Sequence, residues 1–260
     1  MPRQYIKRIL EASVYDVAIE TPVHGMPLLS ETLGNQVLLK REDLQPVFSF
    51  KLRGAYNKIS KLSTREKNRG VIAASAGNHA QGVAISAQKL KIKSIIVMPR
   101  TTPQIKVAAV KRRGSKVVLH GDRFDECCMH AKKLAADNGY VFIHPYDDVS
   151  VIAGQGTIGM EILRQHTDPI HAIFIPVGGG GLIAGVAAYI KYLRPEIKVI
   201  GVEAEDSACL KAAMAAGRRV TLPKIGIFAD GVAVSQIGKE PFRVAKTCVD
   251  EVVTASSDEI

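Results

Sequence analysis

Four consecutive glycines, Gly178 to Gly181, stand between two apolar segments and point to chemistry with phosphate. Residues 172–177 have the character of a buried parallel strand, and residues 182–192 have the spacing of a helix. Glycines let a backbone approach a ligand closely, and the free N–H groups at a helix start carry partial positive charge. The order of strand, glycine loop and helix therefore predicts a binding site for a phosphate group.

Three other interpretations of this stretch compete. A transmembrane helix fits poorly, because Pro176 and four central glycines interrupt the apolar run and no comparable segment exists elsewhere. A tight turn without a ligand is also possible, since glycine turns are common. The third is a dinucleotide fingerprint, with Gly179, Gly181 and Ala184 in a G-x-G-x-x-A pattern and Glu203 about twenty residues further on.

Lys51 is the candidate nucleophile. It falls in the first turn of an expected helix, where the helix dipole disfavours an ammonium, and Phe48, Phe50 and Leu52 supply apolar surroundings. Both effects lower the pKa of a lysine, as Schiff-base chemistry requires. The alternative is an ordinary surface charge, because the chain has 35 lysines and arginines.

The stretch Ser75 to Gly82, SAGNHAQG, closes an expected strand and opens an expected helix. Its backbone N–H groups, with the side chains of Ser75 and Asn78, could hold a carboxylate. The alternative is a simple helix cap, since Ser and Asn are ordinary caps. His79 could take part in catalysis, although a single histidine at a helix start is more often structural.

Strands and helices alternate from residue 69 onward, which predicts an α/β fold with a parallel, doubly wound sheet. Ser49 is expected to cap the helix that begins near Lys51, and Pro103 to be the first residue of its helix. The expected strands are residues 36–40, 71–74, 94–98, 116–119, 141–143, 172–177, 197–202 and 251–254; the expected helices are residues 3–20, 51–62, 79–90, 103–113, 124–138, 154–166, 182–192 and 207–216.

Two α/β lobes with short connections are expected, because the chain contains no repeat and no Ser/Gly-rich linker. Residues 1–54 and 150–260 would form the larger, phosphate-binding domain, and residues 55–149 the smaller one. Ligands of such sheets bind at the carboxyl ends of the strands. The two candidate loops, 75–79 and 178–181, would then meet at the mouth between the lobes.

The composition is that of a soluble globular protein, with 47% hydrophobic and 23% charged residues in 260. The net charge of +10 could indicate a nucleic-acid partner, but the cations are scattered and Trp is absent, so we expect neither nucleic acid nor membrane as a partner. The four cysteines form no C-x-x-C pair or metal-ligand spacing, and residues 1–20 contain three acids. These features favour a reduced, cytoplasmic protein.

Three motifs together resemble one enzyme family. They are SFKLRGA (49–55), SAGNHAQGVA (75–84) and PVGGGGL (176–182), and in this order they are similar to the pyridoxal-phosphate enzymes of the tryptophan-synthase-β fold type, fold type II. Within that group the chain resembles the biosynthetic threonine dehydratases, in particular through REDLQPVFSFKLRGA (41–55) and VEAEDSACLKAA (202–213). The resemblance extends over nearly all of the sequence.

This resemblance implies roles for individual residues. Lys51 would carry pyridoxal 5'-phosphate on its amine and later move the substrate α-proton, while Phe50 would lie beside the cofactor ring and Asn78 would bind the ring hydroxyl. The phosphate would be held by the N–H groups of Gly178, Gly179, Gly180, Gly181 and Leu182. The substrate carboxylate would be held by Ser75, Ala76, Gly77 and Asn78.

The implied reaction converts L-threonine to 2-oxobutanoate and ammonia, the first step of isoleucine biosynthesis, with L-serine as a second substrate and a homo-oligomer (tetramer or dimer) as the implied assembly. A catabolic threonine/serine dehydratase, an NAD-binding oxidoreductase and an inactive binding fragment remain as alternatives. The family usually places a Ser or Thr against the pyridine nitrogen, in a stretch that does not occur before Ile260. We therefore expect a fragment that retains its cofactor weakly.

Two positions differ from the related serine racemases. Ala76 stands where those enzymes have a second serine, so racemisation is not expected. Their divalent-cation site is also incomplete, because Cys209 stands where an acid is expected although Glu203 matches. No metal is therefore expected.

Overall fold

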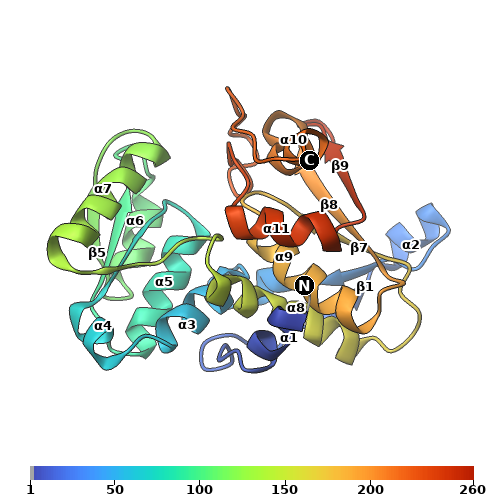
Figure 1. The fold of residues 1–260 in the computed structure, drawn as a ribbon, viewed down its shortest axis with the longest axis horizontal. Helices are drawn as coiled ribbons and strands as arrows, with labels where there is room; N and C mark the ends of the chain where they lie inside the picture. The colour runs from blue at the N-terminus through green and yellow to red at the C-terminus, as the bar shows by residue number, and fades with distance from the viewer. Residues whose placement is uncertain (1–2) are drawn as a thin grey trace.

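The computed structural model describes residues 3–260, which form two lobes side by side, each built around a parallel sheet (Figure 1). This confirms the expected α/β class with mainly parallel sheets. A separate antiparallel pair of short strands, β1 (Val23–Gly25) and β2 (Leu38–Lys40), lies beside the lobe with the three-stranded sheet.

The four-stranded lobe has the strand order β5-β4-β3-β6, with every pair parallel. Its strands are β3 (Val71–Ala74), β4 (Ser94–Met98), β5 (Lys116–Leu119) and β6 (Val141–Phe142). All four residues of β3 are buried, as expected for an apolar central strand covered on both faces. The chain order reverses between β3 and β6, and such a switch point opens a crevice at the carboxyl ends of the strands.

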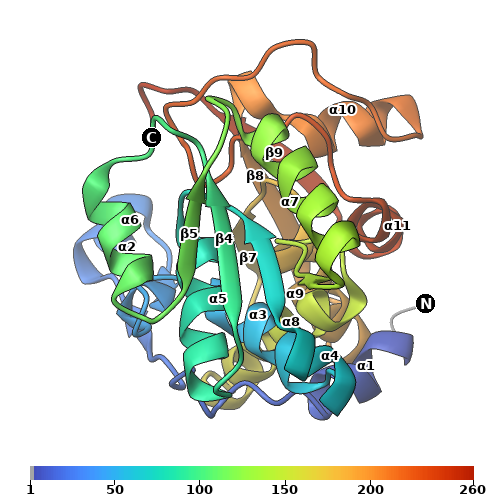
Figure 2. The ribbon, with the colours of Figure 1, turned by 90° about the vertical axis from the view of Figure 1, so that its left-hand side faces the viewer.

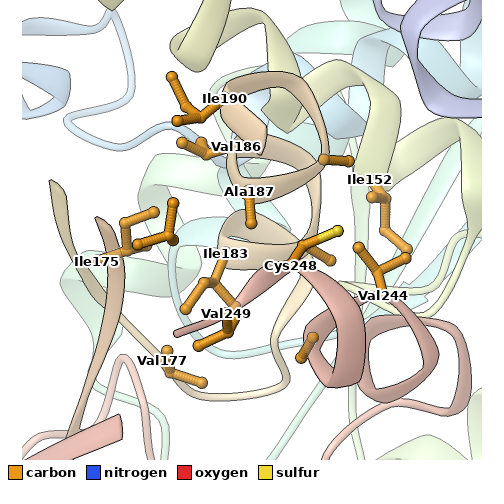
Figure 3. Packing of buried hydrophobic residues seen from close by; sticks show 14 of the residues in the cluster. Ile152, Ile175, Val177, Ile183, Val186, Ala187, Ile190, Val244, Cys248 and Val249 are labelled. Carbon is orange, nitrogen blue, oxygen red and sulfur yellow. The ribbon is translucent and has the colours of Figure 1, made fainter. Parts of the chain in front are cut away.

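The three-stranded lobe has the order β7-β8-β9, also parallel, with β7 (Ala172–Pro176), β8 (Lys198–Ala204) and β9 (Glu251–Ala255). Helix α9 (Gly181–Leu193) follows β7, and α11 (Lys239–Cys248) packs against α9. Figure 3 shows the core between them, where side chains of α9 meet those of α11, β7 and α8 (Val149–Gln165).

The remaining helices surround these two sheets (Figure 2). They are α1 (Arg3–Leu10), α2 (Pro27–Leu33), α3 (Lys51–Ser60), α4 (Thr64–Arg69), α5 (Asn78–Lys89), α6 (Gln104–Lys111), α7 (Phe124–Asn138) and α10 (Cys209–Ala216), with 3₁₀ turns at Glu42–Leu44 and Glu205–Ser207. No helix within residues 3–260 is both long enough and apolar enough to cross a membrane.

The largest buried cluster joins Tyr5 and Ile9 of α1 to α8 and α9, so the N-terminal helix packs with the three-stranded lobe. A second cluster joins Ala55 and Ile59 of α3 to the four-stranded sheet. These cores support the predicted division at residues 54/55 and 149/150, which remains a proposal. Residues 1 and 2 of the predicted larger domain lie outside the described residues.

Glycines allow the central helices to approach closely. A Cβ on Gly54 would lie 2.7 Å from the carbonyl oxygen of Val151, and one on Gly154 would lie 2.7 Å from that of Arg53. A Cβ on Gly185 would lie 2.3 Å from the carbonyl oxygen of Ile152. Helix α8 therefore packs against α3 and against α9 with the backbones in direct contact. At these three positions there is no room for a side chain larger than that of glycine.

Several expected elements were wrong at their ends. The helix expected over residues 3–20 stops at Leu10, because the later apolar residues Val14 and Ala18 pack as an irregular segment against Val47 and Leu52. Pro103 is the cap before α6 rather than its first residue, and α8 begins at Val149 rather than Gly154. Strand β1 and helices α2, α4 and α11 were not expected.

Candidate active site

The glycine loop offers a run of free backbone donors at the start of α9. Among residues 3–260, no protein acceptor pairs with the N–H groups of residues 178–183, whereas the flanking N–H groups of Val177 and Ala184 bond to the carbonyls of Val202 and Gly180. Unpaired donors at a helix N-terminus form an anion site. The loop therefore has the donors that a phosphate group needs.

Two neighbouring segments enclose this loop and explain its composition. A Cβ on Gly179 would lie 2.2 to 2.4 Å from ring carbons of Tyr146, and one on Gly178 would lie 2.9 Å from the Cα of Val232. Gly180 has a φ of +85°, in the left-handed region, and faces Ile237. The glycines are thus required by close protein packing, independently of any ligand.

The loop after β3 offers a second set of donors. The N–H groups of Ala76, Asn78, His79 and Ala80 have no protein acceptor within residues 3–260, and the Asn78 side chain is exposed without a hydrogen bond there. The hydroxyl of Ser75 accepts the N–H of Gly77 at 3.1 Å, which shapes the turn. Ser75 is therefore partly a structural residue, while the donors that follow it remain available to a carboxylate.

Lys51 is the first residue of α3. A Cβ on Gly82 would lie 3.0 Å from the Lys51 carbonyl, so α5 packs directly against this point. Burial lowers the pKa of the Lys51 amine to about 8, and no ion pair or hydrogen bond of this amine is present within the described chain. Its nitrogen lies 5.2 Å from the centre of the Phe50 ring. Ser49, expected as the cap, accepts the N–H of Lys51 at 3.3 Å, but Phe50 holds the cap position.

The segment between β6 and α8 lies between the surroundings of Lys51 and the glycine loop. Burial lowers the pKa of His144, and the charge of Lys51 adds to this, so the amine lies within electrostatic range of the imidazole. The ring of His144 lies edge-on to that of Tyr146 with centres 4.7 Å apart, and Tyr146 contacts Gly179. Both the Lys51 amine and the glycine loop therefore have the segment after β6 in their surroundings, near the switch point between β3 and β6.

His144 and Tyr146 were missed by the sequence reasoning. Both lie in the segment between β6 and α8, where the imidazole Nδ1 of His144 accepts the N–H groups of Tyr146 and Asp147. Burial raises the pKa of Tyr146 to about 12, so its hydroxyl stays protonated at neutral pH. The available signal was topological, because a segment that follows a strand beside the switch point faces the crevice.

The segment between α10 and α11 was missed as well. It contributes Val232 and Ile237 to the walls of the glycine loop, and the N–H of Gly238 bonds to the Gly179 carbonyl at 3.2 Å. Lys106 of α6 reaches this segment from the other lobe, 3.2 Å from Asp230. No helix or strand pattern marks these residues, so periodicity could not identify them.

His79 is a structural residue in this arrangement. Its ring is 4% exposed, and Nε2 lies 2.9 Å from the carbonyl oxygen of Ile143. Burial lowers its pKa to about 3. The imidazole is therefore neutral and donates to the residue that follows β6, which joins α5 to the end of that strand.

Glu203 is occupied by the backbone of α10. Its two carboxylate oxygens accept the N–H groups of Leu210 and Lys211, each at 2.8 Å, and burial raises its pKa. Glu203 is therefore bound as a helix-start partner rather than free for a ribose, which removes the main support for the dinucleotide interpretation. The Cys209 thiol is buried and donates to the Gly178 carbonyl at 3.5 Å.

A phosphorylated carbonyl compound fits these groups. Its phosphate would meet the free N–H groups of the glycine loop, and its carbonyl carbon would meet an amine that loses its proton near pH 8. The second loop of free donors would hold a carboxylate on the opposite side. The residues present therefore fit a lysine-linked pyridoxal phosphate and an amino-acid substrate.

Comparison with known proteins agrees with this chemistry. A family profile described as "Pyridoxal-phosphate dependent enzyme" matches residues 14–260. The biosynthetic L-threonine dehydratase of Burkholderia multivorans is 57% identical over 257 residues, which cover 98% of this chain and 51% of that protein. The chain spans about half the length of the curated relatives that it matches.

Solved structures of two related enzymes have the same fold as this chain. The processed form of threonine deaminase isoform 2 from Solanum lycopersicum superimposes with a TM-score of 0.96 at 52% identity, covering 98% of this chain and 74% of that one. Maize serine racemase gives a TM-score of 0.93 at 32% identity, covering 97% and 77%. Both similarities extend across the two lobes.

Proposed function

Since the chain belongs to the family of pyridoxal-phosphate dependent enzymes, we propose that it acts as an L-threonine ammonia-lyase that yields 2-oxobutanoate and ammonia. The names of its relatives support this substrate, because several are biosynthetic threonine dehydratases at 52 to 57% identity. The observation that carries the proposal is the pairing of two features: the Lys51 amine, buried at the start of α3 without an ionic or hydrogen-bond partner in the described chain, and a loop of free N–H donors at the start of α9.

The binding roles follow from what each group can donate or accept. The N–H groups of Gly178, Gly179, Gly180, Gly181 and Leu182 hold the phosphate, and the Phe50 ring lies beside the cofactor. The exposed amide of Asn78 reaches the ring hydroxyl. The loop Ser75, Ala76, Gly77 and Asn78 holds the carboxylate of the substrate through its free N–H groups.

Lys51 carries the chemistry of this chain. Its amine would hold the cofactor through the carbonyl carbon and, once the substrate amine has taken its place there, would be free to accept the proton from the substrate Cα. When bound, pyridoxal phosphate withdraws electrons from that carbon, which makes this proton acidic. The proton removed from Cα balances the one that the β-hydroxyl of threonine needs to leave as water, and one water is taken up again when ammonia and 2-oxobutanoate are released.

Racemisation is not proposed, although a serine racemase has a similar fold. That reaction needs a second base on the opposite face of the substrate, and Ala76 carries no such group. The free amine of Lys51 is the base that the described site offers on its own face.

We further propose that the cofactor-loaded protein is a homo-oligomer, that it lies in the cytoplasm and that it serves isoleucine formation. The word "biosynthetic" in the names of its relatives supports the last point. All four cysteines are unpaired, which suits a reducing compartment. Sedimentation of the loaded chain would measure its oligomeric state.

The decisive experiment incubates the purified chain with pyridoxal phosphate and measures 2-oxobutanoate from L-threonine and pyruvate from L-serine. We expect both products, with threonine preferred. Visible absorbance that disappears on borohydride reduction would show the lysine-linked cofactor. A chain that takes up the cofactor but releases neither product would contradict the lyase assignment, and a chain that binds a nicotinamide dinucleotide instead would contradict the family role.

A further inference from the structure

A cavity lies in the four-stranded lobe, and none of its lining residues belongs to the proposed cofactor site. It has a volume of about 550 Å³, within the usual range for small-molecule sites. It is formed where β4 and β5 end and the chain turns into α7; in Figure 2 both strands run upward to this edge. The carboxyl ends of parallel strands are where ligands of such sheets bind.

The lining of this cavity is rich in positive and donor groups. Lys133 has no ionic partner among residues 3–260, and neither ring of His120 or His130 has a hydrogen-bond partner there. The two rings are stacked with centres 3.8 Å apart and planes 9° from parallel. Arg100 has only an exposed partner, with its Nε 3.3 Å from Asp122. These cationic and donor groups gather without a buried counter-charge.

The one acid in the lining does not neutralise them. An oxygen of Glu126 accepts the backbone N–H of Asp122 at 2.7 Å and that of Arg123 at 3.3 Å. These two N–H groups lower the pKa of Glu126, so its negative charge is held by the start of α7. The cavity therefore offers an anion the unpaired amine of Lys133 and the imidazole donors, while the Glu126 carboxylate is directed to the backbone at the start of α7.

A metal ion does not suit this arrangement. Ring nitrogens bind metals in the plane of the imidazole, and two parallel rings stacked face to face direct their nitrogens along separate planes. No cluster of three or more metal-ligating side chains occurs among residues 3–260. The imidazole lone pairs do not converge on one point, so these rings suit an anion, to which they can donate hydrogen bonds, better than a metal ion.

We propose that this cavity binds the phosphate group of a small organic phosphate. A phosphate presents three oxygens and close to two charges, which matches an amine, a guanidinium and two imidazole donors better than a carboxylate does. Met129, 66% exposed, provides an apolar wall for the organic part of the ligand. The site is separate from the glycine loop and does not depend on the proposed reaction.

The test follows the histidine side chains by NMR during titration with inorganic phosphate. We use the full chain, with and without pyridoxal phosphate, and assign His120 and His130 from their single asparagine variants. Their signals should shift and saturate in both states. His79 and His144 neighbour the proposed cofactor site, so they report phosphate binding at the glycine loop separately, and the exposed His171 reports general salt effects.

A pair of adjacent lysines provides the matched variants. Lys133→Ala should raise the Kd for phosphate at least about threefold, in keeping with the loss of one exposed charge contact. Lys132→Ala should leave it unchanged, because that amine lies over the Phe142 ring, 5.9 Å from its centre, and does not line the cavity.

Three further titrations, at the same ionic strength, identify the ligand class. Glycerol 3-phosphate should bind at least as tightly as inorganic phosphate, whereas chloride and acetate should give no saturable shift. Equal shifts with acetate would overturn the assignment to phosphate. Unchanged His120 and His130 signals throughout, or equal effects of the two lysine variants, would overturn the site itself.

Discussion

The ring of Tyr146 lies directly against the backbone of Gly179, where even a Cβ would come within 2.4 Å of three ring carbons. Tyr146 follows the last strand of the four-stranded sheet, and Gly179 follows the first strand of the three-stranded sheet. One aromatic ring thus joins the two lobes at the loop that we assign to the cofactor phosphate.

This contact predicts a strong coupling between the two positions. Gly179→Ala should weaken pyridoxal phosphate binding at least tenfold, because the added methyl displaces the loop from the Tyr146 ring. In a Tyr146→Ala background the same change should cost much less, since the obstructing ring is gone. Fluorescence titration of the cofactor measures all four proteins. Gly25→Ala, where nothing lies within 4 Å, is the control; additive effects would contradict the coupling.

Lys51→Ala should abolish both turnover and the visible absorbance of the lysine-linked cofactor, because it removes the buried amine that we assign to the cofactor. Lys111→Ala, at the exposed end of α6, should keep both. Borohydride reduction followed by peptide mass analysis should find the cofactor on Lys51. Its recovery on another lysine would reject the assignment.

The lowered pKa of Lys51 predicts an alkaline dependence of stability. Between its folded pKa of about 8 and its ordinary value of 10.5, the unfolded chain binds a proton that the folded chain does not. The free energy of unfolding contributed by this group therefore rises as the pH rises through this window. The cofactor-free Lys51→Met protein should lack that rise. Parallel curves for the two proteins from pH 8 to 10.5 would show that the amine is not buried.

The lowered pKa of His79 predicts a loss of stability at acid pH. Its folded pKa is about 3 and its ordinary value is 6.5, so the unfolded chain gains a proton first as the pH falls. Stability should be lost from pH 6.5 downward, by up to about 1.4 kcal/mol per pH unit for one proton. His79→Gln should flatten this slope in denaturant titrations, while the exposed His171→Gln should keep it. An unchanged slope in His79→Gln would assign the acid sensitivity to another group.

Arg53 anchors α3 from below the site. Its guanidinium, fully buried, pairs with Glu42 at 2.7 Å and with Glu161 at 2.5 Å. Arg53→Met leaves Glu42 without its ionic partner and Glu161 with Lys40 alone, and the free energy of unfolding should fall by about 3 to 5 kcal/mol. Lys7→Met, which removes an exposed pair with Glu11, should cost less than about 1 kcal/mol. Similar losses in both variants would refute the role of the buried pair.

The sequence predicted the repeating part of the fold well. The apolar runs of β3, β4 and β5 and the periodic helix α7 matched their expected residues, because buried parallel strands and amphipathic helices carry regular patterns. The helix expected over residues 3–20 failed after Leu10, since its spaced apolar residues pack as an irregular segment. Local periodicity cannot distinguish these two forms of burial.

The site was predicted in part, and its named residues remain proposals. Lys51 and the two donor loops could be named because each joins a residue type to a helix start. Tyr146, Val232 and Ile237 could not, because their role depends on the packing of segments far apart in the chain. Glycine at 178–181 serves the close protein packing as well as the proposed phosphate, and sequence reasoning identified only the phosphate.

The close seams at Gly54, Gly154 and Gly185 have a consequence for the reaction rate. Two of the helices that they bring together begin at Lys51 and at Gly181, so the proposed reactive nitrogen and the proposed phosphate loop keep their spacing through contacts about one helix turn away. A single added methyl at a seam would move these two helix starts apart by roughly an ångström, a misplacement that can slow catalysis about a hundredfold. Glycines that contact neither cofactor nor substrate would thereby determine how precisely the reacting groups are positioned.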